Sequence, residues 1–216
     1  MERKRVLIYG DSNTHGYRVS DGLRFSQTER WTGICQQIVS GEIEILEEGL
    51  NGRTTCVDEA GMEFRNGLQY IQPCIRTHLP LDMICVMLGS NDLKSVFLLT
   101  PEEIASQAAK VLAKAREVAR SKYPDSLCEY LLISPIEVGR ELITGPFGWE
   151  FEGELTIAKA KRFAACFAEA ARNHDFLFFD AAKYAAAGKT DGLHLDAENH
   201  RRLGEAMGRW LLAHYA

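Results

Sequence analysis

Five short, mostly apolar runs are spaced along the chain, and they constrain its fold more than any other feature. They lie at Val6–Tyr9, Ile43–Leu46, Met83–Leu88, Tyr130–Ile133 and Phe176–Phe179. A strand with one face in water alternates apolar and polar residues, whereas a parallel strand covered on both faces is apolar almost throughout. The runs therefore predict about five buried, parallel strands.

Helical patterns separate these runs. The clearest begins at Thr100-Pro-Glu-Glu103, where Thr100 is suited to cap the helix and Glu103 completes a capping box. Pro73 interrupts one of the weaker patterns and is expected to kink or end it. The other predicted helices cover Leu155–Asn173, Ala197–Ala213, Trp31–Val39 and Asn66–His78.

Strands that alternate with helices predict an α/β fold, specifically a three-layer α/β/α sandwich with right-handed crossovers. The 216 residues contain no internal repeat, low-complexity tract or linker. We therefore expect residues 1–216 to form a single domain.

Composition limits the partners and the compartment. A net charge of −5 argues against nucleic acid and anionic membranes, which usually bind basic surfaces. The six cysteines have neither paired nor metal-ligand spacing, so we expect buried free thiols and no metal site. The N-terminal residues lack the apolar stretch of a signal peptide, and no run is long enough to span a membrane. A cytoplasmic protein is expected.

Four polar segments follow predicted strands or precede the last helix. They are Gly10–Ser12, Gly49–Gly52, Gly89–Asp92 and Asp191–His194. Ligands of open α/β sheets bind outside the carboxyl ends of the strands. We therefore expect these segments to meet at one edge of the sheet.

Together the segments supply the groups that acyl transfer requires. Ser12 is the candidate nucleophile, His194 the base that accepts its proton, and Asp191 the carboxylate that orients the imidazole. The backbone N–H groups of Ser12 and Gly52 and the side-chain amide of Asn91 are candidate oxyanion donors. Each segment alone has a simpler interpretation as a turn or a helix cap, and only the combination favours catalysis.

Other residues near these segments have either a structural role or a place in the pocket. Asp11 and Asp92 are interpreted as turn organisers, because a triad needs one carboxylate. His15 is a candidate for the pocket wall or a plain surface histidine. Trp31, Phe147 and Trp149 are candidate pocket residues, although aromatic packing under a loop is the commoner role.

The four segments, in this order, resemble the SGNH (GDSL-type) hydrolase family. The residues for which the family is named fall on Ser12, Gly52, Asn91 and His194. The resemblance implies a flavodoxin-like fold and metal-free hydrolysis of small esters, without a cofactor.

A closer likeness is to the arylesterase and acyltransferase branch of this family. Segments that resemble it include Arg30–Gly33, Asn51–Thr55, Met87–Lys94 and Gly145–Phe147. Asn13-Thr14-His15 departs from the Leu-Thr-Trp that many members carry after the nucleophile. The branch implies short-chain esters, acyl transfer in some relatives, and homo-oligomers.

Two other functions remain open. A carbohydrate O-deacetylase uses the same catalytic residues and differs only on the alcohol side of the pocket. A flavodoxin-like module that binds a phosphate or nucleotide is a non-catalytic alternative. This second alternative lacks the glycine-rich fingerprints of nucleotide sites and leaves Asp191 and His194 without a role.

Overall fold

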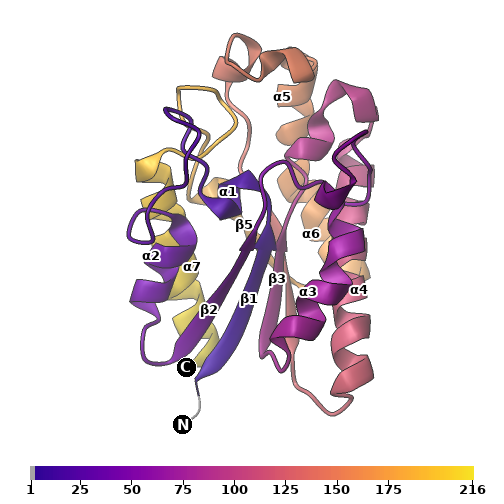
Figure 1. Cartoon of the computed structure of the whole chain (residues 1–216), viewed down its shortest axis with the longest axis vertical. Helices are drawn as coiled ribbons and strands as arrows, with labels where there is room; N and C mark the ends of the chain where they lie inside the picture. Colours follow the sequence, from indigo (N-terminus) through magenta and orange to yellow (C-terminus); the bar gives the residue numbers. More distant parts are fainter. Residues whose placement is uncertain (1–2) are drawn as a thin grey trace.

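The computed structural model describes residues 3–216 and contains one five-stranded sheet. The strands are β1 (Lys4–Gly10), β2 (Ile43–Gly49), β3 (Met83–Met87), β4 (Glu129–Ser134) and β5 (Leu177–Asp180). Their order is β2-β1-β3-β4-β5, and every neighbouring pair is parallel (Figure 1). This is the flavodoxin-like order. The predicted α/β class and three-layer architecture are therefore confirmed.

Helices cover both faces of the sheet (Figure 1). One face carries α2 (Trp31–Ile38) and α7 (Ala197–Tyr215), and the other carries α3 (Gly67–His78), α4 (Pro101–Lys122) and α6 (Phe163–Asn173). The short helices α1 (Ser12–His15) and α5 (Glu154–Ala160) lie at the carboxyl-end edge of the sheet. None of the helices within residues 3–216 has the length and apolar composition that a membrane span requires.

The apolar strands separate two cores. In β1, Val6 and Ile8 join the cluster under α2 and α7, whereas Leu7 and Tyr9 join the cluster under α3, α4 and α6. All four side chains are fully buried. Burial of an aliphatic side chain of this size stabilises the fold by about 1.5–3 kcal/mol. The lack of polar alternation in the sequence therefore follows from burial on both faces.

Two helices differ from the sequence prediction. The pattern over 155–173 forms two helices, because Arg162 N–H bonds to the carbonyl of Lys159 and tightens the chain between α5 and α6. Pro73 does not end its helix, since α3 continues to His78. Pro73 lies on the exposed face of α3, where water can bond to the backbone carbonyl that loses its partner.

The order of the strands fixes where a ligand site can form. The chain moves from β1 outward to β2 on one side and then crosses to β3 on the other side of β1. The connections leave the sheet in opposite directions at this point, which opens a crevice at the carboxyl ends of β1 and β3. Ser12 follows β1, and Asn91 follows β3.

Candidate active site

Ser12, His194 and Asp191 form a continuous chain of hydrogen bonds. The Oγ of Ser12 lies 2.9 Å from Nε2 of His194, and Nδ1 of His194 lies 2.6 Å from Oδ2 of Asp191. All three residues are buried. Ser12 and His194 are within the hydrogen-bond distance that a nucleophile and its base require, and Asp191 is placed to orient the imidazole of His194.

The turn after β1 presents Ser12 at the start of α1. Asp11 caps this helix by accepting a hydrogen bond from the N–H of Asn13 at 2.9 Å. A Cβ on Gly10 would lie only 2.1 Å from Oγ1 of Thr14, so a larger residue would collide with the helix. Gly10 and Asp11 therefore serve the local turn that holds Ser12 in place.

Asp191 is held in one orientation by its own loop. Oδ1 accepts the backbone N–H groups of Leu193 at 2.9 Å and His194 at 3.0 Å, which leaves Oδ2 for the imidazole. Burial alone would raise the pKa of Asp191, but the bonds from the His194 ring and from both backbone groups outweigh it and lower the pKa below its usual value. The carboxylate is therefore ionised at neutral pH.

Asn13 joins the serine segment to the histidine segment. Its side-chain amide donates to the carbonyl of Leu193 at 3.3 Å, and its Oδ1 accepts from the N–H of Leu195 at 2.8 Å. The backbone carbonyl of Asn13 also accepts from the indole N–H of Trp31 at 3.0 Å. These bonds fix Ser12 and His194 relative to each other.

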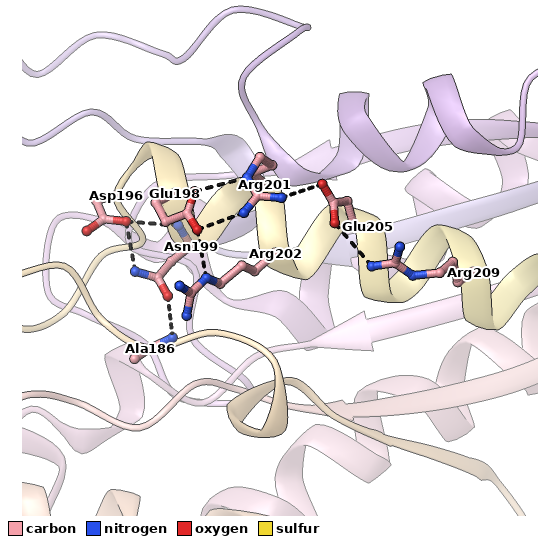
Figure 2. Close-up of polar contacts among 8 residues, drawn as sticks. All are labelled: Ala186, Asp196, Glu198, Asn199, Arg201, Arg202, Glu205 and Arg209. Atoms are coloured by element: carbon pink, nitrogen blue, oxygen red, sulfur yellow. Dashed lines mark hydrogen bonds and ion pairs between the residues drawn. The ribbon is translucent and has the colours of Figure 1, made fainter.

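Asp196, which follows the histidine loop, is hydrogen-bonded to the first turn of α7, as Figure 2 shows. Asp196 caps the helix, and its Oδ1 accepts from both the backbone and the side-chain N–H of Asn199. Oδ1 of Asn199 in turn accepts from the N–H of Ala186 at 2.9 Å. The histidine loop is thus attached to the preceding segment as well as to the helix.

The three candidate oxyanion residues, Ser12, Gly52 and Asn91, line the same cavity. The side-chain amide of Asn91 donates to the carbonyl of Arg53 at 3.0 Å, so it also ties the loop after β3 to the loop after β2. Gly52 has φ of +76°, and a Cβ there would lie 2.6 Å from Nε of Arg65. The backbone conformation and the close guanidinium together account for glycine at this position.

Asp92 holds the second connection between these loops. Its carboxylate accepts from both the backbone N–H of Thr55, at 3.0 Å, and the Thr55 hydroxyl, at 2.6 Å. Burial raises the pKa of Asp11 and of Asp92 to about 6 each, against the hydrogen bonds that they accept. The structure places both carboxylates in turns and does not bring either to the His194 ring.

The cavity has a volume of about 410 Å³ and opens beside Ser12. One wall is aromatic: the His194 ring lies 4.8 Å from the ring of Tyr17 and 5.5 Å from that of Phe147, measured between centroids. Trp149 also lines the cavity, with 82% of its surface exposed. Phe147 and Trp149 were predicted at the pocket, whereas Tyr17 was missed.

Another wall of the cavity is charged, and no pattern in the sequence predicts it. Nζ of Lys94 lies 2.8 Å from Glu59 and 2.6 Å from Glu150, and Arg65 lies 3.0 Å from Glu59. Lys94 is only 8% exposed, so its ion pairs are shielded from solvent. They join three loops around the cavity, which follow β2, β3 and β4.

Two of the predicted pocket residues lie elsewhere. Trp31 begins α2, is fully buried and packs in the core beneath α2 and α7, because its side chain faces the sheet. His15 is half-buried beside β2, and the cavity lining does not include it. Burial and the neighbouring Arg24 lower the pKa of His15. The prediction of both as pocket walls is corrected.

A Ser–His–Asp chain of hydrogen bonds at the carboxyl edge of a flavodoxin-like sheet is the arrangement expected of an SGNH-type ester hydrolase. The model of the GDSL-like lipase/acylhydrolase family matches residues 8–202, and the chain belongs to this family. The predicted family and the class of carboxylic ester hydrolase are therefore confirmed.

Solved structures agree with this assignment. Est24, a carbohydrate acetylesterase from Sinorhizobium meliloti, is 32% identical with a TM-score of 0.89, over 98% of this chain and 99% of that one. The aryl esterase of M. smegmatis is 33% identical with a TM-score of 0.88, over 97% of this chain and 99% of that one. No curated protein sequence matches the chain.

Proposed function

We propose that this ester hydrolase cleaves short-chain acyl esters through an acyl-enzyme on Ser12. The hydrogen-bonded chain from Ser12 through His194 to Asp191 carries the proposal, because it supplies a nucleophile, a base and an anion in sequence. The cavity of about 410 Å³ beside Ser12 is of a size that accommodates a small ester. Similarity to an aryl esterase supports the same substrate class.

In the first half of the reaction, His194 removes the proton of Ser12 as Oγ attacks the ester carbonyl. Asp191 stabilises the imidazolium that forms and remains ionised itself. The negative charge on the carbonyl oxygen is held by the N–H groups of Ser12 and Gly52 and by the amide of Asn91. His194 then protonates the departing alkoxide, which leaves Ser12 acylated.

In the second half, water or another alcohol enters the site. His194 removes the proton of this acceptor while the acceptor oxygen attacks the acyl-enzyme. The tetrahedral intermediate then collapses, and His194 returns the proton to Oγ of Ser12. Water gives hydrolysis, and an alcohol gives acyl transfer. The balance depends on which acceptor the cavity admits.

Covalent labelling tests the role of Ser12. We expect the wild-type enzyme to react with one equivalent of a fluorophosphonate probe and Ser12→Ala to remain unlabelled and inactive on an aryl acetate. Ser134→Ala is a matched control, since Ser134 is also a buried serine at the end of a strand, is not among the residues that line the cavity, and should keep the labelling. A labelled Ser12→Ala would refute the assignment.

The charged wall favours a second candidate, a carbohydrate O-deacetylase. Lys94, Glu59 and Arg65 present hydrogen-bonding groups that suit an alcohol rich in hydroxyls, and exposed Trp149 offers an aromatic face. Similarity to a carbohydrate acetylesterase supports it. The two candidates are separated by comparing kcat/KM for an aryl acetate and for an acetylated sugar.

We propose that the enzyme is one domain over residues 1–216, acts in the cytoplasm and forms a homo-oligomer without nucleic-acid or membrane partners. Six free cysteines support a reducing compartment, and the net charge of −5 argues against polyanions. Exposed Val96, Leu98 and Trp149 support self-association. Light scattering coupled to gel filtration tests the oligomer, and a mass of one chain would refute it.

A further inference from the structure

A cluster of three metal-ligating side chains lies between β2 and α3, outside the cavity described above. Glu48 comes from β2, and Cys74 and His78 come from α3. One ligand atom from each residue lies within 4.8 Å of the other two. Nε2 of His78 is already 2.7 Å from Oε1 of Glu48. We propose that these three residues bind a Zn²⁺ ion.

The arrangement along α3 suits a shared ligand. Cys74 and His78 are four residues apart, so their side chains lie one above the other on the same face of the helix. Glu48 is on an edge strand, and its side chain reaches toward that face, as its contact with His78 shows. Two of the ligands come from a helix and one from a strand, so their backbone is already ordered. Binding of the ion therefore has a small cost in conformational entropy.

The donor set matches zinc in type and in spacing. Sulfur, imidazole nitrogen and carboxylate oxygen are the protein ligands of Zn²⁺, and three of them with a fourth position for water is a known coordination pattern. Ligand atoms around a tetrahedral Zn²⁺ lie about 3.5 Å apart, given metal–ligand bonds of about 2.0–2.3 Å. Small side-chain rotations therefore bring the three atoms, now within 4.8 Å, to the required distance.

The cluster is partly accessible to solvent through two of its three residues. The side chains of His78 and Glu48 are 24% and 22% exposed, whereas Cys74 is 2% exposed behind them. An ion can thus enter past the imidazole and the carboxylate and meet the sulfur last. Burial raises the pKa of Cys74 to about 12, so Zn²⁺ must displace the thiol proton, which passes to solvent as the Zn–S bond forms.

Arg53 adds a positive charge near this cluster. Its guanidinium is bound to the backbone carbonyls of Gly10 and Glu48 and lies 3.9 Å from the Tyr9 ring centroid, so it does not occupy the Glu48 carboxylate. The carboxylate of Glu48 and the thiolate of Cys74 supply two negative charges to the ion. These two charges balance those of the metal ion, and Arg53 leaves one positive charge beside the cluster.

The test uses the full chain, freed of metal with a chelator and then titrated. We expect Zn²⁺ to bind with one equivalent per chain by calorimetry and to raise the melting temperature. Co²⁺, used as a coloured substitute, should give a near-ultraviolet thiolate-to-cobalt absorption band. The chain has six free cysteines, so the band is assigned to Cys74 by its loss in Cys74→Ser.

Variants decide which residues bind. Cys74→Ser should abolish the cobalt–thiolate band, and both Cys74→Ser and His78→Gln should weaken Zn²⁺ binding at least about tenfold. Cys128→Ser, which removes a free thiol that is less buried than Cys74, should leave binding unchanged. Ester hydrolysis reports that the variants are folded, because Cys74 and His78 lie outside the active-site cavity. The absence of a thiolate band in the wild type, or unchanged Zn²⁺ affinity in His78→Gln, would overturn the proposal.

Discussion

Replacing one carboxylate oxygen of Asp191 by an NH₂ group, as in Asp191→Asn, should change the tautomer of His194. In Asp191→Asn, the side-chain oxygen is required at the Oδ1 position, because two backbone N–H groups point there. The new NH₂ group must then face Nδ1 of His194, where Oδ2 now accepts at 2.6 Å. A donor at this position forces Nδ1 to become the acceptor and moves the ring proton to Nε2.

The displaced proton lies at the wrong atom for catalysis. Nε2 of His194 is 2.9 Å from Ser12 Oγ, and once protonated it cannot accept the serine proton. In a Ser-His-Asp protease the equivalent substitution lowers kcat by about 10⁴, or about 5.5 kcal/mol in the barrier. We expect a similar loss of kcat on an aryl acetate at neutral pH, with little change in KM.

Asp191→Ala is the matched comparison. It removes the acceptor without adding a donor, so His194 can adopt either tautomer, and Asp191→Ala should retain more activity than Asp191→Asn. Circular dichroism and thermal unfolding establish that each variant is folded. If Asp191→Asn keeps kcat within about tenfold of the wild type, or is more active than Asp191→Ala, the tautomer argument is refuted.

Two further outcomes are expected. Asn91→Ala should lower kcat about 10²–10³-fold through loss of an oxyanion donor, and steady-state rates near those of the wild type would contradict that role. Burial lowers the pKa of His200 to about 4, whereas in the unfolded chain the imidazole has its ordinary pKa of 6.5 and is protonated more readily. Stability from this residue is therefore present above pH 6.5 and lost on acidification toward pH 4, by up to about 3 kcal/mol. Urea unfolding at pH 7 and pH 4.5 should show a smaller acid loss in His200→Gln, and an equal loss would exclude this contribution.

The fold was accessible from the sequence because its central strands β1, β3 and β4 are buried on both faces. Each apolar run fell on a strand, and parallel pairing followed from the alternation with helices. The division between α5 and α6 was not accessible, since the buried residues across it are three or four positions apart, as in one helix: Ile157, Ala160, Phe163 and Phe167. Periodicity reports which face is buried and is insensitive to a tightened turn between two helices on that face.

The site was predictable where it depends on strand ends and not where it depends on loops. Ser12 and Asn91 follow neighbouring strands, so their proximity follows from topology. The pairing of Lys94 with Glu150 depends on the paths of two long connections, which carry no periodic signal. The contact of Glu48 with His78 likewise joins a strand to a helix, and no spacing in the sequence predicts it.

The hydrogen bonds of Asn13 have a consequence for how this enzyme gains activity as it folds. They connect residues that are 180 and 182 positions apart in the chain. Ser12 and His194 can therefore meet only after nearly the whole intervening chain has folded. Contacts of such long sequence separation have the largest loop-closure cost and are expected to form late. Esterase turnover should therefore appear in a refolding experiment after the helical signal, which makes substrate cleavage a reporter of the final docking step.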